Sequence, residues 1–262
     1  PSNTIYNLAK RMSSHRTMIT GAWALQRQQY GEQPHWMITV LACMLGQIGL
    51  PGGGFGLGYS AENGIGNPVQ YFKWPSLEQF KNPVSEFIPV ARISDMLLQP
   101  GKVFSYNGKE IKYPDIKLVY WAGGNPFHHQ MNLRKLVRAF KQPDTIIVNE
   151  IWWNSLARHS DIILPATTSL ERNDISIKHW DQTISPMHKA IEPVGEAKSD
   201  YEIFSEISSK LNFKDKFTEG KDEDKWLRFI WEESKNKAKE EGFTLPEFNK
   251  FWKNGFQEVL SP

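Results

Sequence analysis

Glycine-rich and polar loops follow four apolar runs of this sequence and contain its most chemically capable residues. The runs are TMITGA (17–22), IKLVYWA (116–122), TIIVNEI (145–151) and DIILPA (161–166). The loops after them are GAWALQRQQYGEQ, GGNPFHHQ, NEIWWN and PATTSLERND. Glycine, arginine, asparagine, glutamate and tryptophan gathered in this way favour the binding of a large polar ligand, and their types suit a nucleotide.

Each of these residue types has a defined use against a nucleotide. The glycine pair 123–124 lets the backbone approach a ligand closely, and amides at a following helix start can hold a phosphate. Arg27 can pair with a phosphate through two hydrogen bonds, and Trp23 offers a flat surface. Glu150 or Asp200 can accept hydrogen bonds from ribose hydroxyls or from the donor edge of guanine.

Structural roles compete with binding roles for several of these residues. His128 and His129 suit a helix entry, one packing and one hydrogen bonding, better than a metal site, because no partner ligands stand at a regular spacing. The pair Trp152-Trp153 is more typical of a core than of a cofactor platform. Ser169 lacks the G-x-S-x-G turn of a hydrolase nucleophile.

For two charged clusters and a second glycine loop, the sequence does not decide between a structural role and a binding role. The segment RHSD (158–161) forms either a salt-bridge cluster or a ligand contact. The segment ERND (171–174) either pairs and caps a turn or takes part in binding. The loop PGGGFGLGY (51–59) is rich in backbone donors, but glycine clusters also form ordinary turns.

Composition excludes several classes of protein. The chain has 262 residues, 40% of them hydrophobic, so it can bury a substantial core. A net charge of +2 without a basic stripe argues against a nucleic-acid partner. No apolar stretch of the sequence is as long as the roughly 18 residues that a membrane-spanning helix requires. The single cysteine, Cys43, predicts no internal disulfide and lies in a pattern typical of a buried helical face.

The elements that must position these loops alternate between strand and helix. Helical patterns cover 32–49, with Pro34 in a first turn and Gly49 as a stop, and 132–141. In the second pattern one side holds Leu133, Leu136, Val137 and Phe140. The alternation predicts an α/β fold with a doubly wound, mostly parallel sheet and helices on both faces. Ligands of such sheets bind beyond the carboxyl ends of the strands.

Composition shifts along the chain predict four parts. Residues 1–57 form the first part of the α/β domain, and 58–115 form an irregular insertion with a hairpin at Asn107-Gly108. Residues 116–212 form the second part, which ends in a helix capped by Asp200, and 213–262 form a helical tail. The opening PSNTIYNLAKRM already has a helical pattern, so we expect the chain to be a piece of a longer protein.

Four segments carry a resemblance to a known family. They are GAWALQRQQYGEQPHWM, LGQIGLPGGGFGLGYSAENGIGNP, YWAGGNPFHHQMN and SLARHSDIILPATTSLERNDI, in this order between Gly21 and Tyr201. They closely resemble the dimethyl sulfoxide, trimethylamine N-oxide and biotin sulfoxide reductases of the molybdopterin oxidoreductase superfamily. The match is specific for the family and much less so for the substrate.

The resemblance implies that this chain is the central domain of a larger enzyme with a bis(molybdopterin guanine dinucleotide) molybdenum cofactor, and that the chain alone holds none. By position, Trp23, Ala24 and Arg27 line the cofactor, with Arg27 near the molybdenum pocket as the catalytic candidate. The matched positions expected to contact the dinucleotide are Gly124, Asn125, His129, Asn149, Glu150, Ser199 and Asp200, the last of which recognises guanine.

The sequence also departs from the family pattern. The reductases hold molybdenum through a serine that precedes this region, and Cys43 lies in no matching segment, so no metal ligand is expected here. The resemblance implies that the C-terminal domain which completes the second dinucleotide site is expected outside these 262 residues. The segment 178–182 is shorter than in some relatives, which bears on the loop before Asp200.

The implied function is oxygen removal from an N-oxide or S-oxide such as trimethylamine N-oxide or dimethyl sulfoxide, with two electrons and two protons consumed and water released. The implied partners are the rest of the parent polypeptide and an electron donor such as a cytochrome c, with the periplasm preferred as the location. An alternative is a guanine-nucleotide-binding α/β module without redox chemistry. A nicotinamide-dependent dehydrogenase is disfavoured, because AGGNPF (122–127) lacks the expected glycine spacing.

Overall fold

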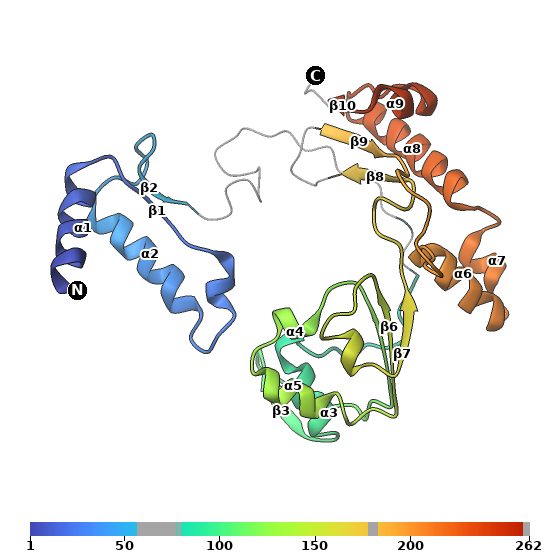
Figure 1. The fold of residues 1–262 in the computed structure, drawn as a ribbon, viewed down its shortest axis with the longest axis horizontal. Helices are drawn as coiled ribbons and strands as arrows, with labels where there is room; N and C mark the ends of the chain where they lie inside the picture. Colours follow the sequence, from blue (N-terminus) through green and yellow to red (C-terminus); the bar gives the residue numbers. More distant parts are fainter. Residues whose placement is uncertain (57–76, 78–79, 178–182, 259–262) are drawn as a thin grey trace. The chain divides into compact units, whose positions relative to one another are not determined.

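The computed structural model describes residues 1–56, 77, 80–177 and 183–258 (Figure 1). The chain divides into two compact units, of which the first is Pro1–Asn67 with His129–Met131 and the second is Pro68–His128 with Asn132–Pro262. Both units contain parallel strands joined by helices, which confirms the predicted α/β class. The predicted limits of the four parts stay a prediction.

The first unit contains a pair of parallel strands and two long helices. Its elements are α1 (Ser2–Ser14), β1 (Met18–Thr20), the 3-10 helix η1 (Trp23–Gln26), α2 (Glu32–Met44) and β2 (Gly54–Gly56). β1 pairs in parallel with β2, from Met18 against Gly54 to Thr20 against Gly56. Gln47 supports this pair, because its side chain accepts from Thr17 N at 2.8 Å and donates to His15 O at 2.8 Å.

Two details of α2 differ from the sequence expectation. Pro34 does lie in the first turn, but the helix ends at Met44 and not near Gly49. Gly46 takes the left-handed conformation after the helix, with φ +66°, and its N–H donates to Cys43 O at 3.0 Å, as at many helix ends. Cys43 is exposed and Ala42 is buried instead, so the predicted buried face at Cys43 is wrong.

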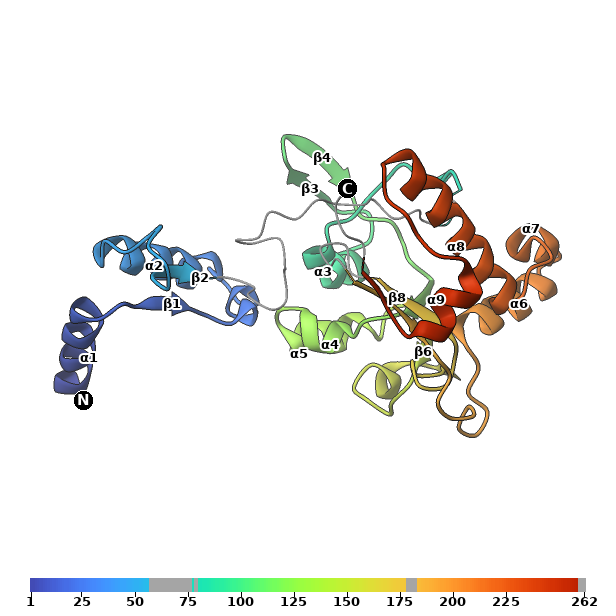
Figure 2. The same ribbon diagram turned by 90° about the horizontal axis from the view of Figure 1, so that it is seen from above.

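The described part of the predicted insertion contains a short helix and the expected hairpin. Its elements are η2 (Val90–Arg92), α3 (Ile93–Leu98), β3 (Val103–Tyr106) and β4 (Lys109–Lys112), with β3 antiparallel to β4 (Figure 2). Asn107 and Gly108 have φ of 49° and 74°, the conformation that a two-residue turn requires. The hairpin is therefore confirmed, whereas residues 58–76 and 78–79 of the predicted insertion lie outside the described residues.

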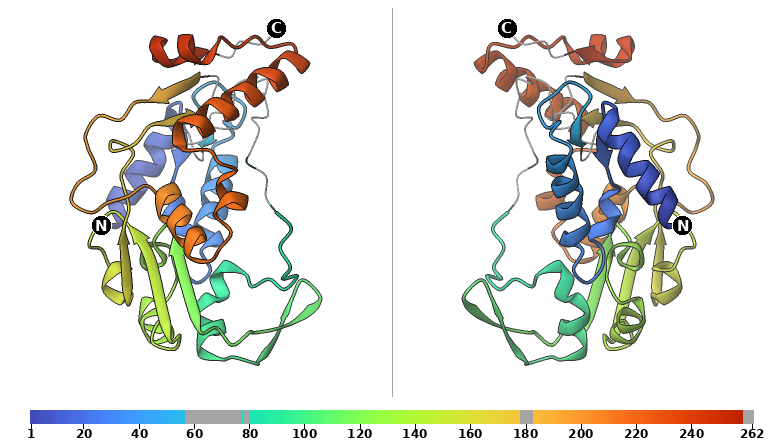
Figure 3. Two further views of the ribbon diagram at one scale, coloured as in Figure 1. Left: turned by 90° about the vertical axis from the view of Figure 1, so that its right-hand side faces the viewer. Right: turned by 90° about the vertical axis from the view of Figure 1, so that its left-hand side faces the viewer.

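A three-stranded parallel sheet forms the centre of the second unit (Figure 3). Its elements are β5 (Leu118–Ala122), α4 (Pro126–His129), α5 (Leu133–Ala139), β6 (Thr145–Glu150), η3 (Ala157–His159) and β7 (Ile162–Pro165). β6 lies between β5 and β7. These are three of the four predicted strands. The fourth, β1, pairs with β2 in the first unit, so the expectation of one sheet from all four is wrong.

Helices cover both faces of this sheet, as predicted. On one face Val148 packs in a core with Leu136 of α5, and both are fully buried. On the other face Tyr120 contacts Phe204 of α6, with ring centroids 5.5 Å apart. Leu133, which shares the predicted apolar side of α5 with Leu136, is 46% exposed at the helix start.

The remaining elements of the second unit form a small antiparallel sheet and four helices. They are β8 (Asp174–Ile177), β9 (Thr183–Met187), α6 (Asp200–Lys210), α7 (Lys214–Thr218), α8 (Glu223–Glu240), α9 (Phe248–Asn254) and β10 (Gln257–Glu258). A second core lies here, where Trp231 stacks on Phe251 at 3.8 Å and donates through Nε1 to Pro246 O at 2.9 Å. Within the described residues, no helix has both the length and the apolar character needed to cross a membrane.

Candidate functional site

The carboxyl ends of three parallel strands bring most of the predicted site residues in the second unit to one edge. Ala122 of β5 is level with Asn149 of β6, which is level with Leu164 of β7. A bridge between Ala166 and Lys198 brings the start of α6 to the same edge. The residues gathered here are Gly124, Asn125, Asn149, Glu150, Ser199 and Asp200. Their binding roles stay a prediction.

The turn after β5 leaves room for a ligand. Gly123 and Gly124 have φ of 79° and 71°, which strongly favours glycine, and a Cβ added at either would meet nothing within 4 Å. Trp121 Nε1 donates to Gly123 O at 2.9 Å and fixes the turn. Asn125 Oδ1 accepts from Phe127 N at 2.9 Å, but the buried Nδ2 of Asn125 has no partner within the described residues. A buried donor without a partner is costly and indicates that an acceptor is supplied from elsewhere.

Two side chains link β6 to α6 across the edge. Asn149 is 6% exposed, and its Nδ2 donates to Asp200 Oδ1 at 2.8 Å. Tyr120 on β5 donates its hydroxyl to Asn149 Oδ1 at 2.8 Å. Burial raises the pKa of Tyr120, and the negative charge of Asp200 adds to this, whereas the bond to Asn149 opposes it. Tyr120 is therefore a neutral donor at neutral pH.

Ser199 starts α6, and Asp200 does not. Ser199 is 3% exposed, and its hydroxyl accepts from Glu202 N at 3.2 Å while Glu202 Oε2 accepts from Ser199 N at 2.8 Å. This reciprocal capping box corrects the prediction that Asp200 caps the helix. Asp200 is instead the first helical residue, and its exposed carboxylate is stabilised by the helix dipole.

Glu150 holds the loop after β6, and two tryptophans project from it. Glu150 Oε1 accepts from Ile151 N at 2.9 Å and from Trp152 N at 3.4 Å. Trp152 and Trp153 are 68% and 66% exposed. The interpretation of this pair as core is wrong, because both side chains are exposed in the loop that follows the end of β6 at Glu150.

The segment 171–174 does cap a turn. Glu171 is buried, and its carboxylate accepts from Thr168 N and Oγ1, each at 2.7 Å, and from Val194 N at 2.7 Å. These hydrogen bonds lower the pKa of Glu171, those from Thr168 most. Arg172 Nη2 lies 3.3 Å from Asp174 Oδ2. The capping alternative is confirmed for Glu171. For Arg172 the binding alternative stays a prediction, because its side chain also lines a pocket.

The segment 158–161 and the histidine pair differ from expectation. His159 Nδ1 lies 2.7 Å from Ser155 O, and Asp161 Oδ2 accepts from Ile146 N at 2.8 Å, so both bond to the backbone and form no salt-bridge cluster. His128 and His129 lie in α4 and both are exposed, so neither is the packed member that the sequence suggests. In the described ranges, no three His, Cys, Asp or Glu side chains are grouped so as to hold a metal.

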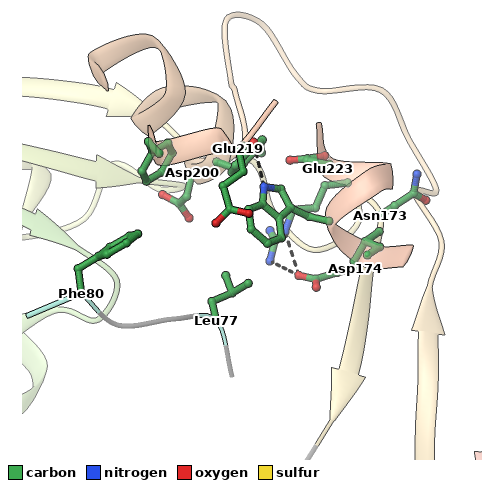
Figure 4. Close-up of a pocket in the computed structure, with 13 residues that line it drawn as sticks. Leu77, Phe80, Asn173, Asp174, Asp200, Glu219 and Glu223 are labelled. Carbon is green, nitrogen blue, oxygen red and sulfur yellow. Dashed lines mark hydrogen bonds and ion pairs between the residues drawn. The ribbon is translucent and has the colours of Figure 1, made fainter. Parts of the chain in front are cut away.

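A pocket of about 520 Å³ opens beside Asp200 (Figure 4). Its walls combine charged and aromatic side chains, including Arg172, Asp200, Tyr201, Glu219, Glu223 and Trp226. Trp226 is held in place because its Nε1 donates to Tyr201 Oη at 3.1 Å, while Lys221 Nζ lies 4.3 Å from its ring centre. The sequence interpretation missed Glu223 and Trp226, because the pattern of an amphipathic helix does not show which of its half-buried residues face a pocket. It also missed Glu219, which follows α7 in a short turn with no motif of its own.

The first unit has its own candidate residues on the turn after β1. Trp23, Ala24 and Arg27 lie on or directly after η1, and all three are exposed. Arg27 N donates to Ala24 O at 2.9 Å, so the backbone fixes the turn while the guanidinium is left to solvent. The described part of the glycine loop, Pro51–Gly54, lines a separate pocket of about 720 Å³ in this unit. His129 belongs to the first unit.

Comparison with known proteins supports the resemblance seen in the sequence. The chain is 47% identical to biotin sulfoxide reductase of Cereibacter sphaeroides over 97% of its own length and 34% of the relative. It is 46% identical to trimethylamine-N-oxide reductase of Haemophilus influenzae, covering 96% of this chain and 32% of that protein. It is 44% identical to dimethyl sulfoxide/trimethylamine N-oxide reductase of Rhodobacter capsulatus, covering 98% of this chain and 33% of that protein.

The chain thus spans about a third of the length of these relatives. The family model described as molybdopterin oxidoreductase matches residues 5–210, which include every predicted site residue. The model stops before α7 and α8, which supply part of the pocket beside Asp200. The chain belongs to the molybdopterin oxidoreductase family.

Proposed function

We propose that this chain is the cofactor-binding central domain of a molybdenum-dependent reductase that removes oxygen from N-oxides or S-oxides. Family membership implies a molybdenum–molybdopterin cofactor. The observation that carries the proposal is the edge of β5–β7, where Asn149 holds the exposed carboxylate of Asp200 beside a pocket lined by Arg172. We propose bis(molybdopterin guanine dinucleotide) as the form of the cofactor in the full-length protein, with none held by this chain alone.

The residues at this edge fit a dinucleotide. The open space over Gly123 and Gly124 admits a ligand against the backbone, and the unpartnered Nδ2 of Asn125 would donate to a phosphate or sugar oxygen. Glu150 keeps the neighbouring loop in place through its two backbone bonds. When bound, the cofactor supplies the redox chemistry and the transfer of the oxygen atom, while the chain supplies orientation and electrostatics.

The pocket beside Asp200 suits the guanine end of the cofactor. The Asp200 carboxylate accepts from the two neighbouring donors of guanine, N1–H and the N2 amino group. Arg172 is a cation able to pair with a phosphate, and Trp226 supplies an aromatic wall. Ser199 contributes indirectly, because its hydroxyl is engaged in starting α6.

The first unit has a different task in this proposal. The exposed Arg27 places a permanent positive charge after β1, which would attract the polarised oxygen of the substrate or an anionic part of the cofactor. Trp23 and Ala24 would pack against the cofactor, and His129 would donate to it. We also propose a periplasmic location and a cytochrome c as electron donor, both by resemblance to the family.

The experiment that tests the proposal compares this chain with the full-length protein that carries it. We expect the purified chain to reduce neither trimethylamine N-oxide nor dimethyl sulfoxide, and the full-length enzyme to reduce at least one. We expect Asp200→Asn in the full-length enzyme to lower the guanosine monophosphate that acid hydrolysis releases per polypeptide. Asp144→Asn, an exposed aspartate at the opposite edge of β6, is the control and should leave it unchanged.

Two results would contradict the proposal. Reduction of either substrate by the isolated chain would show that the chain is not a dependent domain. Tight binding of guanosine diphosphate by the isolated chain in calorimetry would favour a nucleotide-binding module without redox chemistry, whereas weak binding fits half of a shared site.

A further inference from the structure

Two consecutive hydrogen bonds lead from Tyr120 through Asn149 to Asp200, and in each the donor lies on the side of Tyr120. The Asn149 side chain has one acceptor and one donor group, and it uses both: Oδ1 accepts from the Tyr120 hydroxyl, and Nδ2 donates to Asp200 Oδ1. If the amide were rotated by half a turn, its oxygen would face a carboxylate and its N–H would face the hydroxyl. The Asp200 carboxylate can only accept, so it sets this orientation of the amide, and the Tyr120 hydroxyl holds Asn149 in it by donating to the amide oxygen.

We infer that Tyr120 is a positioning residue that acts through Asn149 to hold the Asp200 carboxylate in the orientation that recognises guanine. The inference rests on the proposed function, in which Asp200 contacts the guanine end of the cofactor. Tyr120 is not among the predicted site residues. It lies within an apolar strand run, and the partner of its hydroxyl, Asn149, is 29 residues further along the chain.

The chain of bonds leaves part of Asp200 available. One oxygen, Oδ1, is occupied by Asn149, and within the described residues no other side chain bonds to the carboxylate. Guanine offers two adjacent donors on one edge, whereas cytosine offers one amino group beside a ring acceptor. A carboxylate fixed by Asn149 favours the first pattern, because the ring nitrogen of cytosine would face a negative oxygen.

The burial of the chain of bonds makes it effective. Asn149 is 6% exposed and Tyr120 is half-buried against Phe204, so water cannot readily replace the tyrosine hydroxyl. Burial raises the pKa of Tyr120, which keeps its proton on the hydroxyl. Consecutive hydrogen bonds in such surroundings polarise one another and strengthen the last bond, here the one to Asp200.

The test titrates the cofactor-free full-length protein with guanosine diphosphate and, separately, with cytidine diphosphate, by calorimetry. The measured quantity is the ratio of the two affinities. We expect Tyr120→Phe to lower this ratio roughly three- to tenfold, the size expected for one lost hydrogen bond in a buried chain. A merely structural role would weaken both nucleotides equally and leave the ratio unchanged. The ring and its packing against Phe204 are kept in this variant.

Four further variants make the outcome decisive. Tyr113→Phe removes a hydroxyl from a buried tyrosine away from the edge and should leave the ratio unchanged. Asn149→Ala should lower the ratio, and adding Tyr120→Phe to it should change nothing more, because the tyrosine acts through the asparagine. Asp200→Asn should lower the ratio most.

The outcomes separate this inference from the function on which it rests. If Asp200→Asn lowers the ratio but Tyr120→Phe matches Tyr113→Phe, the role of Tyr120 is overturned and the proposed function stands. If Asp200→Asn also leaves the ratio unchanged, guanine is not recognised at this edge and both proposals are overturned. Thermal unfolding of each variant provides the check that the protein is folded.

Discussion

The two units hold their candidate residues in different ways. At the edge of β5–β7 in the second unit, candidate side chains bond to one another and to the backbone, as Asn149 does with Asp200. On the turn after β1 in the first unit, Trp23 and Arg27 are exposed, and it is backbone bonds that shape the turn. Both hydrophobic cores lie in the second unit, and Ala42 is the only buried hydrophobic residue in the described part of the first.

This difference shows which group of candidate residues is held in a fixed geometry before any ligand binds. Side chains that are already bonded in the right geometry lose little freedom when a ligand binds, so the second unit is preorganised. The first unit presents exposed groups whose geometry the ligand or the rest of the protein must complete. Changes in the second unit should therefore affect stability and binding together, and changes in the first should affect binding and activity alone.

The largest expected effect comes from the core that supports the edge. Leu136→Ala should destabilise the chain by about 2–5 kcal/mol, because it removes a fully buried side chain next to Val148. Urea unfolding followed by circular dichroism measures this. Leu133→Ala, on the same helix but 46% exposed, is the control and should cost less than about 1 kcal/mol. Equal losses for the two variants would show that the core is not where the packing places it.

A smaller loss is expected at the start of α6. Ser199→Ala removes the side-chain half of the capping box and should cost about 1 kcal/mol. It should also weaken guanine nucleotide binding in the full-length protein, since Asp200 is the next residue. Ser209→Ala, at an exposed position of the same helix, is the matched control. If Ser199→Ala altered binding without altering stability, the serine would contact the ligand directly and the comparison between units would need revision.

Sequence patterns predicted the strands and the edge, because both depend on local order along the chain. Continuous apolar runs identified β5, β6 and β7, and parallel pairing then required the loops after them to meet. The same reasoning failed for β1, since an apolar run does not specify its partner, and β1 pairs with a glycine strand that lacks any apolar pattern. Pairing depends on tertiary contacts, which periodicity does not contain.

Individual roles at the site were harder to predict than its location. Trp152 and Trp153 suggest a core by type, yet they lie beyond a strand end and are exposed. Asp200 and Ser199 both suit a helix cap, and only the observed bonds distinguish them. Tyr120 could not be identified, because its partner Asn149 belongs to another strand. Resemblance to relatives suggested the candidate residues, and the packing of side chains between elements decides what each residue contacts within the chain.

The dependence of stability on acidic pH tests the turn that Glu171 holds in the second unit. Hydrogen bonds from Thr168 and Val194 lower the pKa of Glu171 in the folded chain, so its contribution to stability is present above its unfolded pKa of about 4.3 and is lost as the pH falls through the folded pKa. Glu171→Gln should therefore reduce stability at pH 7 and flatten its fall between pH 7 and pH 3. The loss should be modest, because glutamine still offers one oxygen to the donors.

Thermal unfolding at several pH values measures this change. Glu192→Gln is the control, because the Glu192 side chain is 83% exposed and its one ion pair among the described residues is with Lys189 at the surface. Its curve should follow that of the unchanged chain. An unchanged acid slope in Glu171→Gln would mean that other carboxylates govern the acid sensitivity of the second unit.

The smallest effect on stability, and the sharpest contrast, is expected for Arg27 in the first unit. Arg27→Ala should change the free energy of unfolding of the chain by less than about 0.5 kcal/mol, because the side chain is exposed and the turn is held by backbone bonds. In the full-length enzyme, Arg27→Ala should strongly lower the rate of N-oxide or S-oxide reduction while the nucleotide content stays unchanged. Arg27→Lys should restore only part of the activity, because a lysine keeps the charge but not the planar pair of donors. Arg16→Ala, another exposed arginine of the first unit, is the matched control and should leave activity unchanged. A loss of stability equal to that of Ser199→Ala would show that the turn after β1 depends on its side chains as much as the edge of β5–β7 does, and the contrast between the two units would disappear.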